Sequence, residues 1–349
     1  MKNSLLFVPI VLLFLFSLQS CENERKVPDT SNIDLQLNIN RFEQDLFSID
    51  SNHVEEGILQ LNQKYPAFSE LFFTRILPLK RGINSDSAFF KNVKGLITFK
   101  PIQRLVDTCN IVFSDMNDIE SQLTSAYKYY KYYFPKKDVP NIYTLISEYA
   151  YQTFLFDDNA QDGIGISLDM FLGSNYPYAQ IDPQNTAFSN YLTRTFNKEH
   201  LVKKTLDATI DDLVGVPKGN RLLDLMIHNG KKLYILDHLL PHTHDSIKLE
   251  YTKSQLDWVN SNEKQTWAHF LAEDLLYETN AKKIAKLINP SPKAPPGMPT
   301  TAPGRVANWM GWRIVNMYMR RNPNVSMDQL IIETDAQSIL SKSKYKPKR

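Results

Sequence analysis

The pattern of hydrophobic and polar positions begins with one unbroken apolar run, LLFVPIVLLFLFSL, at residues 5–18. Lys2 precedes this run, which is shorter than the roughly 20 residues that a helix needs to cross a bilayer. A positive residue followed by a short apolar stretch is typical of a secretory signal peptide. The pattern therefore predicts an exported protein that loses residues 1–20.

The last residue of the apolar run and the three residues after it, Leu18 to Cys21, match the bacterial lipobox. In that motif a cysteine receives diacylglycerol. The alternative is an ordinary signal peptide that happens to contain a cysteine. Several acyl chains, such as palmitate, on one cysteine would anchor the protein stably, whereas a single chain binds only marginally. No later stretch approaches about 18 apolar residues. We therefore expect an envelope protein that is anchored through Cys21, does not span the membrane and faces the periplasm.

The next pattern is polar and then alternating. Residues 22–32 are polar and are predicted to form a flexible tether (residues 21–32 with the lipidated cysteine). Ile33, Leu35, Leu37 and Ile39 alternate with polar residues, which predicts a half-buried strand. Helical periodicity dominates from about 52 to 134. The tyrosines that end this stretch fall on one helical face and favour core packing over a binding surface.

Three strand patterns follow, at residues 142–147, 152–156 and 163–171. The connection DDNAQDG resembles a calcium loop, but Asp162 stands where that loop needs glycine and Leu168 where it needs a bidentate glutamate. We interpret it as a turn in which Asp162-Gly163 supplies the bend.

From about residue 186 the periodicity is helical to the end of the chain. Asn262 with Gln265 and Ser326 with Gln329 have capping-box spacing. Residues 289–304 contain six prolines and must run as an extended loop. After that loop, an apolar stripe flanked by two tryptophans predicts a helix deep in the core: Val306, Met310, Ile314, Met317, Trp309 and Trp312. The predicted fold class is α+β, predominantly α-helical with a small sheet, in one globular domain from 33 to 349.

Composition and charge narrow the function. The chain is 42% hydrophobic and 11% aromatic, enough for a sizeable core. Its net charge of +2, together with export, argues against nucleic acid as a partner. There are two cysteines, and lipidation would consume Cys21. Cys109 lies among apolar residues and is predicted to be a buried structural cysteine.

One predicted helix contains a polar block inside an apolar pattern. The segment MIHNGKKLYILD, residues 226–237, is flanked by leucines on both sides. We expect Gly230 to allow close helix packing, and Lys231 and Lys232 to reach solvent along their apolar stems. The residues that we take as a candidate cleft or partner surface are His228, Asn229, Gly230, Lys231 and Asp237.

The usual catalytic and metal-binding signatures are absent from the sequence. His238 and His242 are four residues apart, as zinc ligands on a helix would be, but Pro241 should end the helix between them. A metal site in the loop that contains His242 and His244 remains an alternative. There is no HExxH motif, GxSxG elbow, phosphate loop or dinucleotide fingerprint. We therefore predict no catalytic residue, no metal and no cofactor.

Several motifs follow the lipobox in order along the chain. They are INRFEQDLF (39–47), NQKYPAFSELFF (62–73), ISLDMFLGSNYPYA (166–179), NGKKLYILDHLLP (229–241), YTKSQLDWVNSNEKQTWAHF (251–270), APGRVANWMGWRIVNMYM (302–319) and SILSKSKYKP (338–347). Together these ordered motifs resemble the GldB family of gliding-motility lipoproteins. This resemblance implies a lipid-anchored envelope protein that is needed for gliding and works with other motility or secretion proteins, without an established catalytic activity.

A fainter resemblance is to the scaffold of HExxH-type zinc peptidases, in which a later helix supplies a glutamate just before a glycine. Here Asn229 precedes Gly230, and a neutral carboxamide is a poor zinc ligand. This resemblance implies a zincin-like scaffold that has lost its metal. Two hypotheses remain: a non-catalytic assembly or coupling component, or a hydrolase with a metal held by His228, His238, His242 or His244. The sequence leaves open whether the inner or the outer membrane carries the protein.

Overall fold

The computed structural model describes residues 26–79 and 87–347 of the chain. The predicted signal peptide and the predicted lipidation site at Cys21 lie outside these residues. Within the described part of the chain, no helix is long and apolar enough to cross a membrane.

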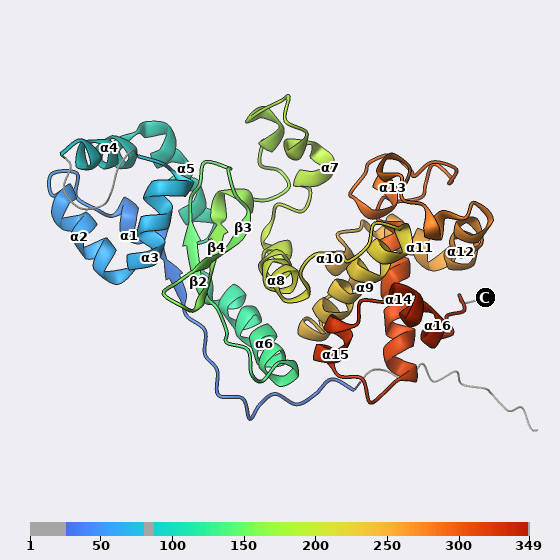
Figure 1. The fold of residues 1–349 in the computed structure, drawn as a ribbon. Coiled ribbons are helices and arrows are strands. Elements are labelled where there is room, and N and C mark those ends of the chain that lie inside the picture. Colours follow the sequence, from blue (N-terminus) through green and yellow to red (C-terminus); the bar gives the residue numbers. More distant parts are fainter. Residues whose placement is uncertain (1–25, 80–86, 348–349) are drawn as a thin grey trace, which may run out of the picture.

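A four-stranded mixed sheet lies beside a larger set of helices (Figure 1). Its strands are β1 (Ile39–Arg41), β2 (Asn141–Leu145), β3 (Thr153–Asp157) and β4 (Asp162–Ser167). The strand order is β1-β2-β4-β3, with β1, β2 and β4 parallel and β3 antiparallel to β4. The predicted strand cluster is confirmed, except that the last strand ends at Ser167 and not at residue 171, because Leu168–Met170 form a 3₁₀ turn.

The first strand is shorter than its alternating pattern predicted, because residues 33–38 lie outside the sheet. They run instead along a helix of the core. The backbone N–H of Leu37 donates to Oγ1 of Thr124 at 3.3 Å, and that of Ile39 donates to Glu120 Oε2 at 3.4 Å. These side chains satisfy donors that a longer strand would pair with β2.

The turn between β3 and β4 is formed by residues 158–161. Asn159 and Ala160 both have positive φ, 57° and 70°, the hairpin geometry that matches the twist of antiparallel strands. The prediction that Asp162-Gly163 supplies the bend is therefore wrong, because both residues pair within β4. The glycine serves packing: a Cβ at Gly163 would overlap the ring of Phe156.

The helical stretch predicted from about 52 to 134 is confirmed, and a short helix that was not predicted, α1 (Phe42–Phe47), precedes it. The predicted stretch contains α2 (Val54–Lys64), α3 (Pro66–Leu71), the π-helical turn η1 (Phe72–Ile76), α4 (Ser87–Thr98), α5 (Lys100–Val112) and α6 (Asn117–Tyr133). In α6, Tyr127, Tyr129 and Tyr130 are buried, as the core-packing interpretation predicted. Cys109 is also buried, at 1% exposed, and burial raises the pKa of its thiol, so it packs as a small hydrophobic residue.

The chain after the sheet is mainly helical, as predicted. Its elements are η2 (Leu168–Met170), η3 (Tyr178–Gln180), η4 (Thr186–Phe188), α7 (Asn190–Thr193), α8 (Lys198–Val214), α9 (Leu222–Leu239), α10 (Asp245–Leu249), α11 (Lys253–Ser261), α12 (Glu263–Ala272), η5 (Leu275–Tyr277), α13 (Ala281–Ile288), α14 (Val306–Arg321), α15 (Met327–Ile332) and α16 (Ala336–Ser343).

Two details of the helix ends test the capping predictions. Ser326 and Gln329 form the predicted capping box at the start of α15. Asn262 does precede α12, but its side chain makes no cap there. Its amide instead donates at 2.8 Å to the carbonyl of Trp258, which also accepts the backbone N–H of Asn262 at 3.0 Å where α11 ends. Residues 289–304 contain no helix or strand, as the prolines required.

Helix α8 connects the two parts of the fold. It packs against β3 and β4 on one side and against α9 on the other, and α9 in turn packs along α14 (Figure 1). The predicted apolar stripe of α14 is in the core, with Val306, Met310 and Ile314 fully buried and Trp309 at 1% exposed. Met317, at the end of that stripe, is only partly buried.

Helices α9 and α14 touch backbone to backbone at a pair of glycines. A Cβ on Gly230 would overlap the carbonyl of Gly311 and come within 2.8 Å of the Trp312 nitrogen. A Cβ on Gly311 would overlap the carbonyl of Met226. The prediction that Gly230 allows close packing is confirmed, and the two glycines fix the distance at which the helices cross.

We expect Gly230→Ala to destabilise the protein by about 1–3 kcal/mol, because the added methyl group must push two packed helices apart. The measurement is the free energy of unfolding in urea. Gly95→Ala is the matched control, since Gly95 is also helical and a Cβ there meets nothing within 4 Å. That control should be neutral or stabilising by up to about 1 kcal/mol. Equal midpoints for the two variants would contradict the proposed contact.

Candidate functional site

The polar block of α9 faces three different directions. Gly230 faces α14, as described above. His228 and Lys231 line a groove formed with the end of α8 and with α15. Asn229 and Lys232 line a second cavity, bordered by α8, α10 and α14. Because a helix turns by about 100° per residue, consecutive polar residues cannot share one site, and the candidate surface divides into two.

Lys231 does not reach solvent, contrary to the prediction. The residue is 6% exposed, and its Nζ donates to the carbonyls of Ile331 and Glu333 at the end of α15. A lysine there satisfies carbonyls that lack a helical partner. Burial lowers the pKa of Lys231. Lys232 is the exposed member of the pair and lies 2.9 Å from Asp211 of α8.

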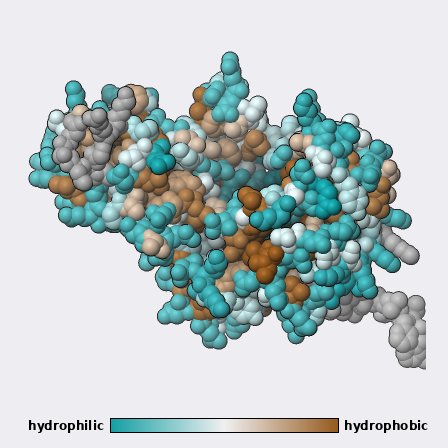
Figure 2. Space-filling view, in the orientation of Figure 1, coloured by the Kyte–Doolittle hydropathy of each residue, from teal (hydrophilic) through white to brown (hydrophobic). Residues whose placement is uncertain are grey.

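The groove beside His228 is mostly apolar and encloses about 330 Å³. Val216 and Ile332 are each 73% exposed, which is high for large hydrophobic side chains. Figure 2 shows hydrophobic surface near the centre of this face, over the region where α9 and α15 meet. The apolar residues that line the groove are Val214, Val216, Ile227, Ile331, Ile332 and Ala336.

The second cavity, of about 210 Å³, is lined mainly by charged and amide side chains. Its cationic residues are Lys203, Lys232, Lys248 and Arg305, its carboxylates are Asp207 and Asp211, and its amides are Asn229 and Asn308. The amide of Asn229 donates to Asn308 Oδ1 at 2.9 Å, which ties α9 to the first turn of α14. We call this space the charged cavity.

Behind the charged cavity, Glu250 is the centre of a buried ion network. Its carboxylate accepts hydrogen bonds from Lys203 at 2.7 Å, Lys204 at 2.9 Å and Arg305 at 2.9 Å. Burial alone would raise the pKa of Glu250, but these cations hold it well below the usual value. Glu250 is therefore ionised in the folded protein and joins α8, α10 and α14.

One ion pair extends this network along α8, and a separate pair of contacts involves Asp237. Lys203 and Asp207, one turn apart on α8, lie 2.6 Å from each other. Asp237, a member of the candidate surface, accepts a hydrogen bond from the buried Lys248, which also lies 2.7 Å from Asp245. Asp237 thus pairs with a buried lysine of α10 and does not line the groove.

The histidines considered as metal ligands are not gathered at one site. Helix α9 ends at Leu239, as Pro241 predicted, so His238 and His242 do not share a helix. His238 is buried, with its Nδ1 2.7 Å from the carbonyl oxygen of Tyr234. His244 caps α10, and His242 is exposed. Among residues 26–79 and 87–347, no group of three or more His, Cys, Asp or Glu is arranged to hold a metal ion.

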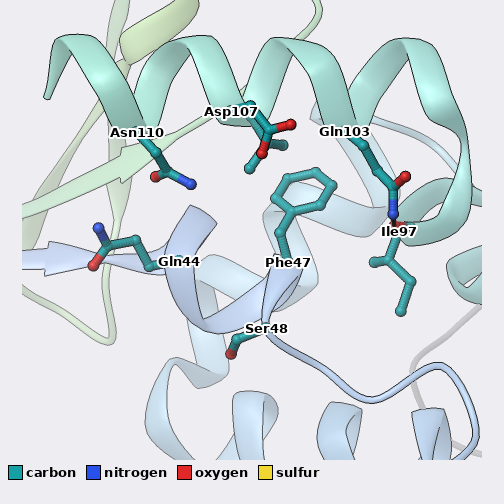
Figure 3. A pocket seen from close by; sticks show the side chains of 8 residues that line it. Gln44, Phe47, Ser48, Ile97, Gln103, Asp107 and Asn110 are labelled. Carbon is teal, nitrogen blue, oxygen red and sulfur yellow. Dashed lines mark hydrogen bonds between the residues drawn. The ribbon is translucent and has the colours of Figure 1, made fainter. Parts of the chain in front are cut away.

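A larger and more open cavity, of about 540 Å³, lies between α1 and α5. In Figure 3, Asp107 and Asn110 extend from α5 toward the ring of Phe47 on α1. Its polar side chains are exposed, and Gln103 already donates to the carbonyl of Ile97 at 3.1 Å. The sequence analysis did not identify this cavity, because its two helices are distant in the chain and carry no catalytic or metal-binding motif. It offers hydrogen-bonding surface without an activated group.

Comparison with known proteins identifies the chain as a whole. The family model described as gliding motility protein GldB matches residues 23–347. The chain belongs to the GldB family. Comparisons with curated proteins and with solved structures returned no match. The resemblance inferred from the sequence motifs is thus confirmed.

Membership in the GldB family makes this chain a gliding-motility-related lipoprotein, and so a membrane-anchored protein of the cell envelope. The match spans α8, α9 and α14, so the groove and the charged cavity both lie in the matched region.

We expect His228 to make this GldB-family protein sensitive to mild acid. Burial, together with Lys232 and Lys231, lowers the pKa of His228 from 6.5 to about 4. Below pH 6.5 the unfolded chain therefore takes up a proton that the folded protein does not. The stabilising contribution is complete above pH 6.5 and is lost as the pH falls toward 4.

The measurement is the free energy of unfolding by denaturant between pH 7 and pH 4. His228→Gln should lose stability less steeply than the wild type over this range. Burial also lowers the pKa of His200 to about 4, and this residue contributes equally to both proteins. His242→Gln, at an exposed position, should keep the wild-type slope. If His228→Gln also keeps that slope, His228 does not carry the effect.

Proposed function

We propose that this chain is a non-catalytic component that assembles or couples the gliding machinery. It is held at the membrane by lipid on Cys21 and contacts a protein partner through the groove between α8, α9 and α15. The observation that carries this proposal is the identity of two residues of α8, Lys203 and Asp207, which line the same cavity as Asn229.

Zinc peptidases of the HExxH type place two histidines one turn apart on a helix, and a third ligand comes from elsewhere in the fold. In this chain, two residues of α8 one turn apart line the same cavity as Asn229, and they are Lys203 and Asp207. They form a salt bridge of 2.6 Å. An ammonium group has no lone pair to offer a metal. The chemistry of these residues supports a scaffold without a metal centre.

A non-catalytic component acts by contact, and the groove supplies a surface for it. Scattered exposed hydrophobic residues are ordinary, but contiguous apolar surface with a polar rim marks interaction sites. Val216 and Ile332 both line the groove, and His228 and Lys218 contribute polar groups. An apolar side chain or a helix face of a partner protein fits this chemistry.

We expect the double variant Val216→Asp/Ile332→Asp to fold normally, because both side chains are largely exposed. It should abolish gliding and the crosslinks that wild-type cells form through this surface, because a buried aspartate in the interface lacks a partner. The measurements are colony spreading and crosslinking in cells. Ile111→Asp is the control, since Ile111 is 78% exposed on α5, away from the groove.

Normal gliding by the double variant would exclude the groove as the contact surface. Metal analysis of the protein purified without chelators tests the other half of the proposal. Stoichiometric zinc, with an activity that is lost when the zinc is removed, would overturn the non-catalytic role and favour the hydrolase hypothesis.

For the anchor, we expect Cys21→Ala to prevent lipid attachment. The variant should remain either unprocessed or soluble in the periplasm, and radiolabelled palmitate should no longer be incorporated. Fractionation of cells and labelling check this outcome. A processed variant that still partitions wholly with membranes would contradict lipidation at Cys21.

A further inference from the structure

We propose that the segment of the partner protein that enters the groove carries a carboxylate among apolar side chains, and that this carboxylate pairs with Lys231. The inference rests on the proposed contact through the groove between α8, α9 and α15, and it specifies the chemistry of the partner. The observation behind it is a buried lysine that lines an apolar groove and has no carboxylate partner within the described part of the chain.

The hydrogen bonds of Lys231 leave its charge uncompensated. Its Nζ donates to the backbone carbonyls of Ile331 and Glu333, and an ammonium group has three donors, so one donor remains. Burial lowers the pKa of Lys231, and the attraction of the Glu333 carboxylate offsets this only in part. A buried charge is costly unless it is paired with an opposite charge. A carboxylate in the groove would supply that charge.

The carboxylates around the groove are bound to other groups of the chain. Asp224 lines the groove, but Arg221 donates to both of its oxygens, at 2.9 and 2.7 Å. The carboxylate of Glu333 accepts the backbone N–H of Asp335 at 3.0 Å, and Asp335 in turn caps α16. Neither Glu333 nor Asp335 lines the groove. The counter-ion of Lys231 must therefore come from another molecule.

The rest of the groove wall favours an apolar segment with a negative charge. Lys218 is an exposed lysine that also lines the groove. Burial lowers the pKa of His228 to about 4, so this residue is neutral at pH 7. Val216 and Ile332 present exposed apolar surface beside these residues. Complementary charge selects among partners, so a cationic segment would be repelled, and a wholly apolar segment would leave the two lysines of the groove without counter-ions.

The test is photo-crosslinking in cells that make the full-length protein, with a photoreactive amino acid in place of Val216. Mass spectrometry identifies the captured peptide. We expect a segment of a different protein in which an aspartate or a glutamate stands among apolar residues. Capture of a segment without a carboxylate, of a lipid or of a second copy of this chain would overturn the proposal.

Lys231→Met is the test variant, because methionine keeps an unbranched apolar side chain and removes the charge. Lys232→Met is the matched control, since Lys232 is the next residue of α9 but lines the charged cavity and not the groove. We expect Lys231→Met to lower the yield of the crosslink about ten-fold, because a hydrogen bond between charged groups is lost. Lys232→Met should leave the yield unchanged. Unfolding in urea shows whether each variant is folded.

A second measurement does not depend on the folding of the Lys231 variant. An amide in place of the carboxylate of the captured segment should lower the yield as much as Lys231→Met does. The two changes together should cause no further loss, because they remove the same interaction. An undiminished yield after either change would overturn the pairing with Lys231 and leave the groove contact in place. The absence of any captured protein would overturn the groove contact itself, and this inference with it.

Discussion

The contact between Gly230 and Gly311 sets the geometry on which both candidate surfaces depend. It brings the backbones of α9 and α14 together without intervening side chains. Residues next to Gly230 on α9 must then point to either side of α14. Asn229 consequently reaches Asn308 in the first turn of α14, whereas Lys231 reaches the end of α15. A larger residue at either glycine would displace these polar groups from their partners.

The Glu250 network is the second constraint, and it acts on specificity more than on stability. Buried ion pairs cost desolvation energy that their attraction only partly offsets, so their net contribution is small. Loss of one partner is different, because it leaves a buried charge uncompensated, at a cost of about 3–5 kcal/mol. Glu250 thus requires α8, α10 and the start of α14 to meet in one arrangement.

Much of the fold could be predicted from local patterns. Three examples are the alternation in β4, the prolines of 289–304 and the apolar stripe of α14. Each depends on residues that are close together in the chain. The errors arose where a distant partner decides the outcome. Gly163 was interpreted as a turn residue, but the ring of Phe156 across the hairpin requires it.

In the candidate site, too, local features could be predicted and features set by distant partners could not. Gly230 could be predicted to pack closely, because glycine inside an apolar helix has few other uses. The burial of Lys231 could not, because its acceptors are backbone carbonyls about 100 residues away. Lys203, Glu250 and Arg305 were missed because they come from three separate segments and match no catalytic or metal-binding motif. The one available signal was the spacing of Lys203 and Asp207, which suits an ion pair on a helix.

The Lys203–Asp207 pair also limits how this protein can change. A metal-ligand set at these positions would need new side chains on α8 and on α9 together. Replacement of Lys203 alone would leave Asp207 and Glu250 with less positive charge beside them, and replacement of Asp207 alone would leave Lys203 with one partner fewer. Each single step therefore unbalances a buried network before any ligand set is complete. A metal-ligand set at these positions would therefore require several buried residues to change together.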